Sequence, residues 1–164
     1  MAVAFRHGIK ADLARGRDKK AAASAEKYRQ CFQTTGEMRA EAMMLLSLSD
    51  VHLARGKPEE ALHSAYEARF IFQGAGDVKG QVLALHQVGE VQKEFNAAAE
   101  MLESAGDALE LLMGFDDPQL QARIMEIKSH ACQISGDAEG ALSATQEGLA
   151  LSRRAGDKLG EAVA

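Results

Sequence analysis

The chain has 164 residues, of which 46% are hydrophobic and 26% charged, with two prolines and a net charge of -5. This composition excludes a disordered chain, and the negative balance argues against a surface that neutralises nucleic-acid phosphates. No apolar run approaches the roughly 18 residues of a membrane span, and charges interrupt the amino-terminal MAVAFRHGIK where a signal peptide would be apolar. Cys31 and Cys132 show neither disulfide nor zinc-site spacing. We therefore expect a cytoplasmic chain with no nucleic-acid or membrane partner.

The stretch LARG occurs at residues 13–16 and again at 53–56, forty positions later. When residues 13–36 are aligned with residues 53–76, 11 of the 24 pairs are identical, whereas chance would give about two. The identical pairs are Leu13/Leu53, Ala14/Ala54, Arg15/Arg55, Gly16/Gly56, Ala21/Ala61, Ser24/Ser64, Ala25/Ala65, Arg29/Arg69, Phe32/Phe72, Gln33/Gln73 and Gly36/Gly76. The sequence is therefore a repeat with a period of forty residues.

Two turn positions recur in each repeat, twenty residues apart. The first holds Gly16, Gly56, Asn96 and Gly136, and the second holds Gly36, Gly76, Asp116 and Gly156. Glycine and asparagine tolerate the left-handed conformation that ends a helix, so each repeat is predicted to be a pair of helices. In chain order the helices are expected at 2–15, 18–34, 37–54, 58–73, 77–94, 97–113, 117–134 and 138–153, with a ninth that begins at Asp157 and is cut off.

The residues after the turns support these helix starts. Asp77, Asp117 and Asp157 are placed to cap a helix, and Pro58 and Pro118 stand at first helical positions. The pair Gly106-Asp107 also resembles a turn, but the forty-residue frame places it inside a helix. We expect it to be a solvent-facing interruption of the pattern.

Small residues recur at fixed distances from the first turn glycine. They are Ser49, Gly89 and Ser129 seven before it, Ala21, Ala61 and Ala141 five after it, and Ala68, Ala108 and Gly148 twelve after it. This pattern resembles the tetratricopeptide repeat (TPR), in the long form of kinesin light chains and Pins-type polarity adaptors. The clearest copies are LSDVHLARGKPEEAL (48–62) and QVGEVQKEFNAAAEML (87–102). HEAT and armadillo repeats have a similar period and are the alternative.

The resemblance implies an all-α, right-handed solenoid of helical hairpins, with four helix pairs and a truncated ninth helix. The chain would be a single repeat domain over 1–164, with units near 1–35, 36–75, 76–115 and 116–155 and a stub at 156–164, and part of a longer array. Some positions depart from the family pattern. The slot four before the first turn glycine, usually a large aromatic, holds Asp12, His52, Gln92 and Cys132, and Ile9, Tyr28 and Met101 replace expected small residues.

Catalytic motifs are absent: the sequence has no phosphate-binding loop, nucleophile elbow or metalloprotease helix. His86 and His130, with Glu90 and Glu126, form a set that could bind zinc or act in acid–base chemistry, but polar groove residues account for them more simply. We therefore expect no cofactor and no enzymatic activity.

The resemblance implies a binding surface on the concave face, lined by the first helix of each pair. The groove positions ten, six and three before the first turn residue hold Arg6, Lys10 and Leu13; Leu46, Asp50 and Leu53; His86, Glu90 and Lys93; and Glu126, His130 and Gln133. The Lys and Asn clamps that other family members use for a carboxylate or for peptide backbone are missing. Asp50, Glu90 and Glu126 favour a peptide or helical segment with basic and apolar residues. The expected function is a protein-binding scaffold; the alternative is a module that self-associates through open solenoid ends.

Overall fold

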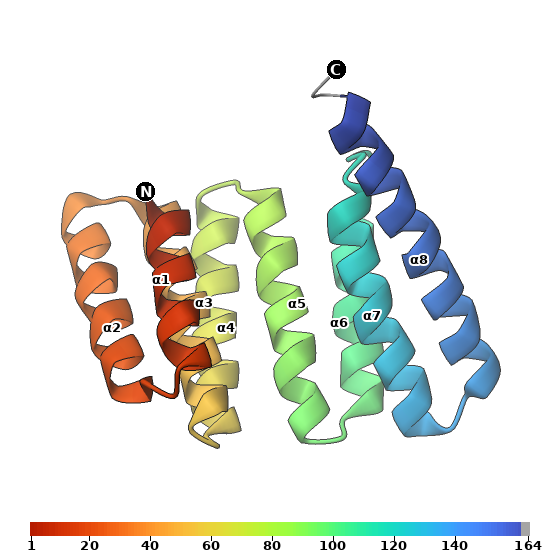
Figure 1. The fold of residues 1–164 in the computed structure, drawn as a ribbon, viewed down its shortest axis with the longest axis horizontal. Coiled ribbons are helices and arrows are strands. Elements are labelled where there is room, and N and C mark those ends of the chain that lie inside the picture. Colours follow the sequence, from red (N-terminus) through yellow and green to blue (C-terminus); the bar gives the residue numbers. More distant parts are fainter. Residues whose placement is uncertain (162–164) are drawn as a thin grey trace. The chain divides into compact units, whose positions relative to one another are not determined.

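The computed structural model describes residues 1–161, which form eight α-helices and no β-strand (Figure 1). The helices are α1 (Ala2–Ala14), α2 (Asp18–Thr35), α3 (Met38–Ala54), α4 (Pro58–Gly74), α5 (Val78–Glu94), α6 (Ala98–Leu111), α7 (Pro118–Ser135) and α8 (Ala138–Glu161). Corresponding helices start forty residues apart, apart from α1, which starts four residues later than the frame requires. The predicted all-α class and the helix pairs are confirmed.

Backbone contacts divide the chain into two compact units, residues 1–87 and 88–164. In the N-terminal unit α1 packs against α2 and α3, α2 packs against α3, and α3 packs against α4. In the C-terminal unit α6 packs against α7, and α7 against α8. Within each unit the helices therefore pack in the order of the chain, which is the serial arrangement of TPR-like helical hairpins.

The predicted turns and caps are largely confirmed. Asn96 has a φ of 53° and Gly136 a φ of 79°, so both occupy the left-handed region that ends a helix. The carboxylate of Asp77 accepts a hydrogen bond from the backbone N–H of Gly80 at 2.9 Å, and that of Asp117 accepts one from Leu120 at 3.2 Å. These contacts satisfy N–H groups that a helix leaves unpaired in its first turn.

Two of the predicted turns are wrong. After α6 the left-handed residue is Gly114, with a φ of 91°, and not Asp116, because the helix ends early at Leu111. The break at Gly156 does not occur, since α8 continues through it to Glu161. A glycine inside a helix costs only about 1 kcal/mol, which its helix-forming neighbours offset. No ninth helix begins at Asp157; its capping side chain and the stub residues 162–164 lie outside the described residues.

The small residues of the pattern lie where helices cross closely. Ala21 and Ala61 are fully buried, and Gly89 of α5 is buried against Ile127 of α7. A β-carbon on Gly89 would lie 2.6 Å from the Cγ2 of Ile127, which is too close unless the Ile127 side chain or one of the helices shifts. Gly106, by contrast, lies inside α6 with open space around it, as the frame predicts.

The position four before the first turn residue is buried and polar in two of the four repeats, where it holds Asp12 and Gln92. Asp12 forms ion pairs with Arg17 at 2.7 Å and Lys20 at 3.3 Å. Gln92 accepts a hydrogen bond from Ser104 at 3.0 Å, so this slot links the two helices of a pair by polar contacts. His52 differs, because its buried Nδ1 has no hydrogen-bond partner. Burial lowers the pKa of His52 below its ordinary 6.5, and Glu60 only partly opposes this effect.

Replacing Gly89 with alanine should destabilise the protein by about 1–2 kcal/mol, because the added methyl group overpacks the contact with Ile127 by more than it gains in helix propensity. Gly106→Ala is the matched control. With open space around it, this change should stabilise the protein by about 0.5–1 kcal/mol. Urea unfolding followed by circular dichroism measures both. Equal effects of the two substitutions would contradict a close crossing at Gly89.

The stability of the protein should decrease as the pH is lowered, partly because of His52. Because the pKa of His52 is lower in the folded state, protons bind the unfolded chain more readily, and stability present above pH 6.5 is lost as the pH falls through that value. His52→Gln should therefore flatten the decline in melting temperature between pH 7.5 and pH 5.5, about one unit either side of that value. His63→Gln, the same change at an exposed position, is the comparison variant. Identical pH profiles for parent and His52→Gln would refute the assignment.

Candidate functional site

In the N-terminal unit the predicted acidic groove residue, Asp50, already pairs with basic side chains of the same chain. Asp50 of α3 forms ion pairs with Arg6 at 3.7 Å and Lys10 at 3.6 Å, both on α1. The Asp50 side chain is 18% exposed and that of Arg6 is 14% exposed, whereas that of Lys10 is 52% exposed. Asp50 therefore stabilises the contact between α1 and α3, and its charge is largely neutralised before any partner arrives.

The structure corrects the prediction that Leu46 lines a groove. Its side chain is fully buried in the core, so a partner cannot contact it. It packs in a cluster with Ala68 and Phe72 of α4 and Ala84 of α5. Its position on a first helix faces the next first helix, not a solvent-filled groove. Leu53 is half-buried, as are His86 and Lys93. A single surface through Asp50, Glu90 and Glu126 stays a prediction.

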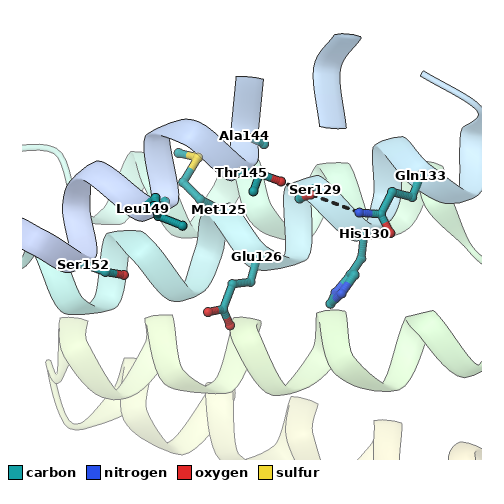
Figure 2. Close-up of a pocket in the computed structure, with 10 residues that line it drawn as sticks. Met125, Glu126, Ser129, His130, Gln133, Ala144, Thr145, Leu149 and Ser152 are labelled. Atoms are coloured by element: carbon teal, nitrogen blue, oxygen red, sulfur yellow. Dashed lines mark hydrogen bonds between the residues drawn. The ribbon is translucent and has the colours of Figure 1, made fainter. Parts of the chain in front are cut away.

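In the C-terminal unit, three predicted residues line a cleft between α7 and α8 (Figure 2). The cleft has a volume of about 340 Å³. It is lined by Met125, Glu126, Ser129, His130 and Gln133 of α7 and by Ala144, Thr145, Gly148, Leu149 and Ser152 of α8. Sequence reasoning found Glu126, His130 and Gln133 but missed the contribution of the second helix.

Hydroxyl groups on the wall of the cleft hold its two helices together. The Oγ of Ser129 and the Oγ1 of Thr145 are 2.8 Å apart, and Thr145 also donates to the backbone carbonyl of Ala141 at 2.8 Å. The Nε2 of Gln133 donates to Ser129 at 3.4 Å (Figure 2). The Ser129–Thr145 contact joins α7 to α8, whereas the other two hydrogen bonds each lie within one helix.

Glu126 and His130 extend from α7 on the same side of the helix (Figure 2). Glu126 is exposed, and no hydrogen bond or ion pair involves its side chain among the described residues. The Nδ1 of His130 is buried without a hydrogen-bond partner. The cleft thus offers an uncompensated carboxylate and an imidazole with unmet hydrogen-bonding capacity, beside the apolar side chains of Met125 and Leu149.

The position of the cleft in the repeat explains what kind of group fits it. Eighty residues earlier, the counterparts of Met125, Glu126 and Gly148 are Leu45, Leu46 and Ala68, which pack with Ala84 of α5. The cleft is therefore the place where a following first helix would lie. Among the described residues no such helix follows α8, and the positions that hold Leu46, Ala65 and Phe72 in the N-terminal unit hold Glu126, Thr145 and Ser152 here.

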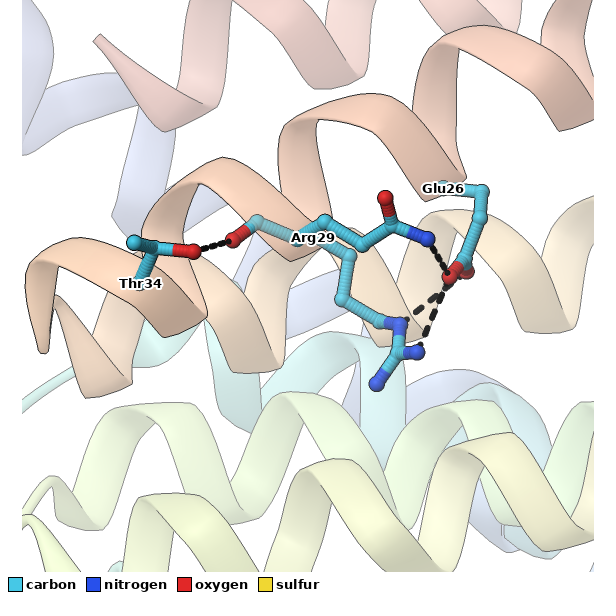
Figure 3. Close-up of polar contacts among 4 residues, drawn as sticks. Glu26, Arg29 and Thr34 are labelled. Atoms are coloured by element: carbon cyan, nitrogen blue, oxygen red, sulfur yellow. Dashed lines mark hydrogen bonds and ion pairs between the residues drawn. The ribbon is translucent and has the colours of Figure 1, made fainter.

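A second polar cluster, on α2, serves the helix itself (Figure 3). Arg29 donates to both oxygens of Glu26, at 3.0 and 2.9 Å, and Gln30 donates to Glu26 at 2.8 Å. The hydrogen bond from Arg29 lowers the pKa of Glu26. All three residues lie within one turn of α2, so the cluster is an ordinary helix-stabilising pair with a neighbouring amide.

No group of three or more His, Cys, Asp or Glu side chains within the described part of the chain is arranged to hold a metal ion. The search for a bilayer-crossing helix over the same residues found none.

Comparison with known proteins gives a distant likeness only. No family model matches the chain, and no curated protein matches it. Among the solved structures that match is a Podosopora anserina protein provisionally named a kinesin light chain, with nearly identical TPR-like repeats. It is 12% identical, with a TM-score of 0.44, over 92% of this chain and 94% of that chain. The forty-residue register and the helix packing, not this match, make the chain an all-helical protein of TPR-like repeats.

Proposed function

We propose that the protein is a non-catalytic scaffold that binds a helical segment of another protein in the cleft between α7 and α8. The observation that carries the proposal is the correspondence between this open cleft and the closed contact of the N-terminal unit. There, Leu45, Leu46 and Ala68 pack with Ala84 of a following helix. The same positions in the C-terminal unit have no such covering helix within the described residues.

The shape of the cleft favours a helix with a small residue at its centre. Ala144 and Gly148 line one wall, and because neither has a long side chain that projects from α8, a partner helix can lie close to α8 beside the exposed Leu149. A β-carbon on Gly148 would lie 3.2 Å from the Cβ of Met125, a tight contact that shows how closely α8 packs on α7 here. An alanine or glycine of the partner would face this point.

The charges of the cleft favour a basic residue beside that small one. Glu126 is exposed and without a cation of its own, and a lysine or arginine of the partner would neutralise it. Leu149 is 52% exposed and would supply apolar contact; covering that remaining half of its surface is worth about 1–1.5 kcal/mol. Glu90 and Lys93, which belong to the same unit as the cleft, are proposed to extend the binding surface.

Selection of helical peptides from a displayed library on the full chain tests the proposal. The selected peptides should combine a small residue with a lysine or arginine one turn away. Fluorescence anisotropy should then show binding that weakens about tenfold or more with Glu126→Lys or Leu149→Arg, since each change removes one of the two attractive groups.

The matched controls make the same chemical changes outside the cleft. Glu110→Lys alters an exposed carboxylate of α6, and Met113→Arg alters an exposed apolar side chain in the turn after it. Both should bind the peptides as the parent does. Peptides that lose affinity with the controls but not with Glu126→Lys would place the binding surface elsewhere on the protein.

A further inference from the structure

We propose that one occupant of the cleft is helix α1 of a second copy of this chain, so that copies associate head to tail. The inference rests on the proposed function, because it assumes that the cleft accepts a helix. It adds the identity of that helix, and it is argued from the free face of α1 and from the charges that the repeat register would bring together.

The face of α1 that would enter the cleft is open. Its residues Ala4, His7 and Ala11 are all exposed. Their counterparts forty residues later are Met44, Ser47 and Val51, and those 120 residues later are Ile124, Ile127 and Ala131; all six are buried. Helix α3 packs against α1 and α2, and α7 packs against α6, whereas among the described residues no helix pair precedes α1.

The open face of α1 also has the size that the cleft requires. Ala4 is the counterpart of Ala84, the residue of α5 that packs among Leu45, Leu46 and Ala68 in the N-terminal unit. One turn further on, Gly8 has no atom within 4 Å of where its β-carbon would be. A helix with these two small residues can approach the wall formed by Ala144 and Gly148 closely.

The ion pairs of Asp50 show which charges would meet. Within the chain, Arg6 and Lys10 are the sixth and tenth residues of one repeat, and both contact the tenth residue of the next, Asp50. At a junction between copies, Glu126 and His130 hold the sixth and tenth positions, and Lys10 of the second copy holds the tenth position of the next repeat. The same geometry would therefore place Glu126 beside Lys10 of the second copy. Here the acidic residue holds the sixth position and the basic residue the tenth, the reverse of Arg6 and Asp50.

Lys10 can make this contact without leaving Asp50 uncompensated. Its side chain is 52% exposed, and Arg6 neutralises the same carboxylate from a more buried position. The contact is heterologous, since it joins two different surfaces. The assembly therefore always has a free cleft at one end and a free α1 at the other, however many copies it contains. The polar lining of the cleft makes the association reversible and concentration-dependent.

Sedimentation velocity over a concentration series tests the inference. The parent chain should show a mass that rises with concentration, while Ala4→Arg and Leu149→Arg, each with one blocked surface, should sediment as monomers. An equimolar mixture of these two variants should form a dimer and nothing larger, because each supplies the surface that the other lacks. This rescue also shows that both variants are folded.

The charge pair is tested by reversal. Glu126→Lys should weaken the association of the parent about tenfold, and the double variant Lys10→Glu with Glu126→Lys should recover it. A parent that stays monomeric at the highest concentration, or a mixture that gives no dimer, overturns self-association. If the selected helical peptides still bind the cleft in that case, the proposed scaffold function stands; if they also fail to bind, both inferences fall.

Discussion

The close crossing of helices at small side chains is the constraint on which this structure depends. Where Ala21 and Ala61 are fully buried, and where Gly89 meets Ile127, the backbones approach each other as nearly as their side chains permit. A fixed approach distance gives every pair similar surfaces, one facing the preceding pair and one facing the next. The surface left open after α8 is thus a consequence of the same packing that closes the core of each unit.

That open surface is not chemically equivalent to the closed ones. The positions of Leu46, Ala65 and Phe72 in the N-terminal unit become Glu126, Thr145 and Ser152 in the C-terminal unit. The substitutions make the cleft of about 340 Å³ polar on the side of Glu126, Thr145 and Ser152. An apolar contact surface of the N-terminal unit is thus replaced by one that carries a carboxylate and two hydroxyl groups.

The sequence predicted the helices well because turn residues and small residues recur with one period. It failed where one residue type has two roles: Gly156 has the spacing of a turn but continues α8, since a glycine weakens a helix without ending it. It predicted the site less well, because a groove position says nothing about what covers it. Leu46 is buried by α5, and Asp50 is neutralised by α1; both depend on contacts between repeats. The available sequence signal for the cleft was that Glu126 stands at the position that holds Leu46 eighty residues earlier.

The ion pairs of Asp50 also set how α1 and α3 align along their lengths. Apolar packing at small residues is nearly the same at successive turns, so it tolerates a shift of one helix along the other. The contact of Arg6 and Lys10 with Asp50 does not, because a shift would separate Asp50 from at least one of its two cations. A polar contact inside an otherwise interchangeable interface can specify alignment, as a single buried polar residue does in coiled coils. Asp50 thus fixes the register of α1 against α3.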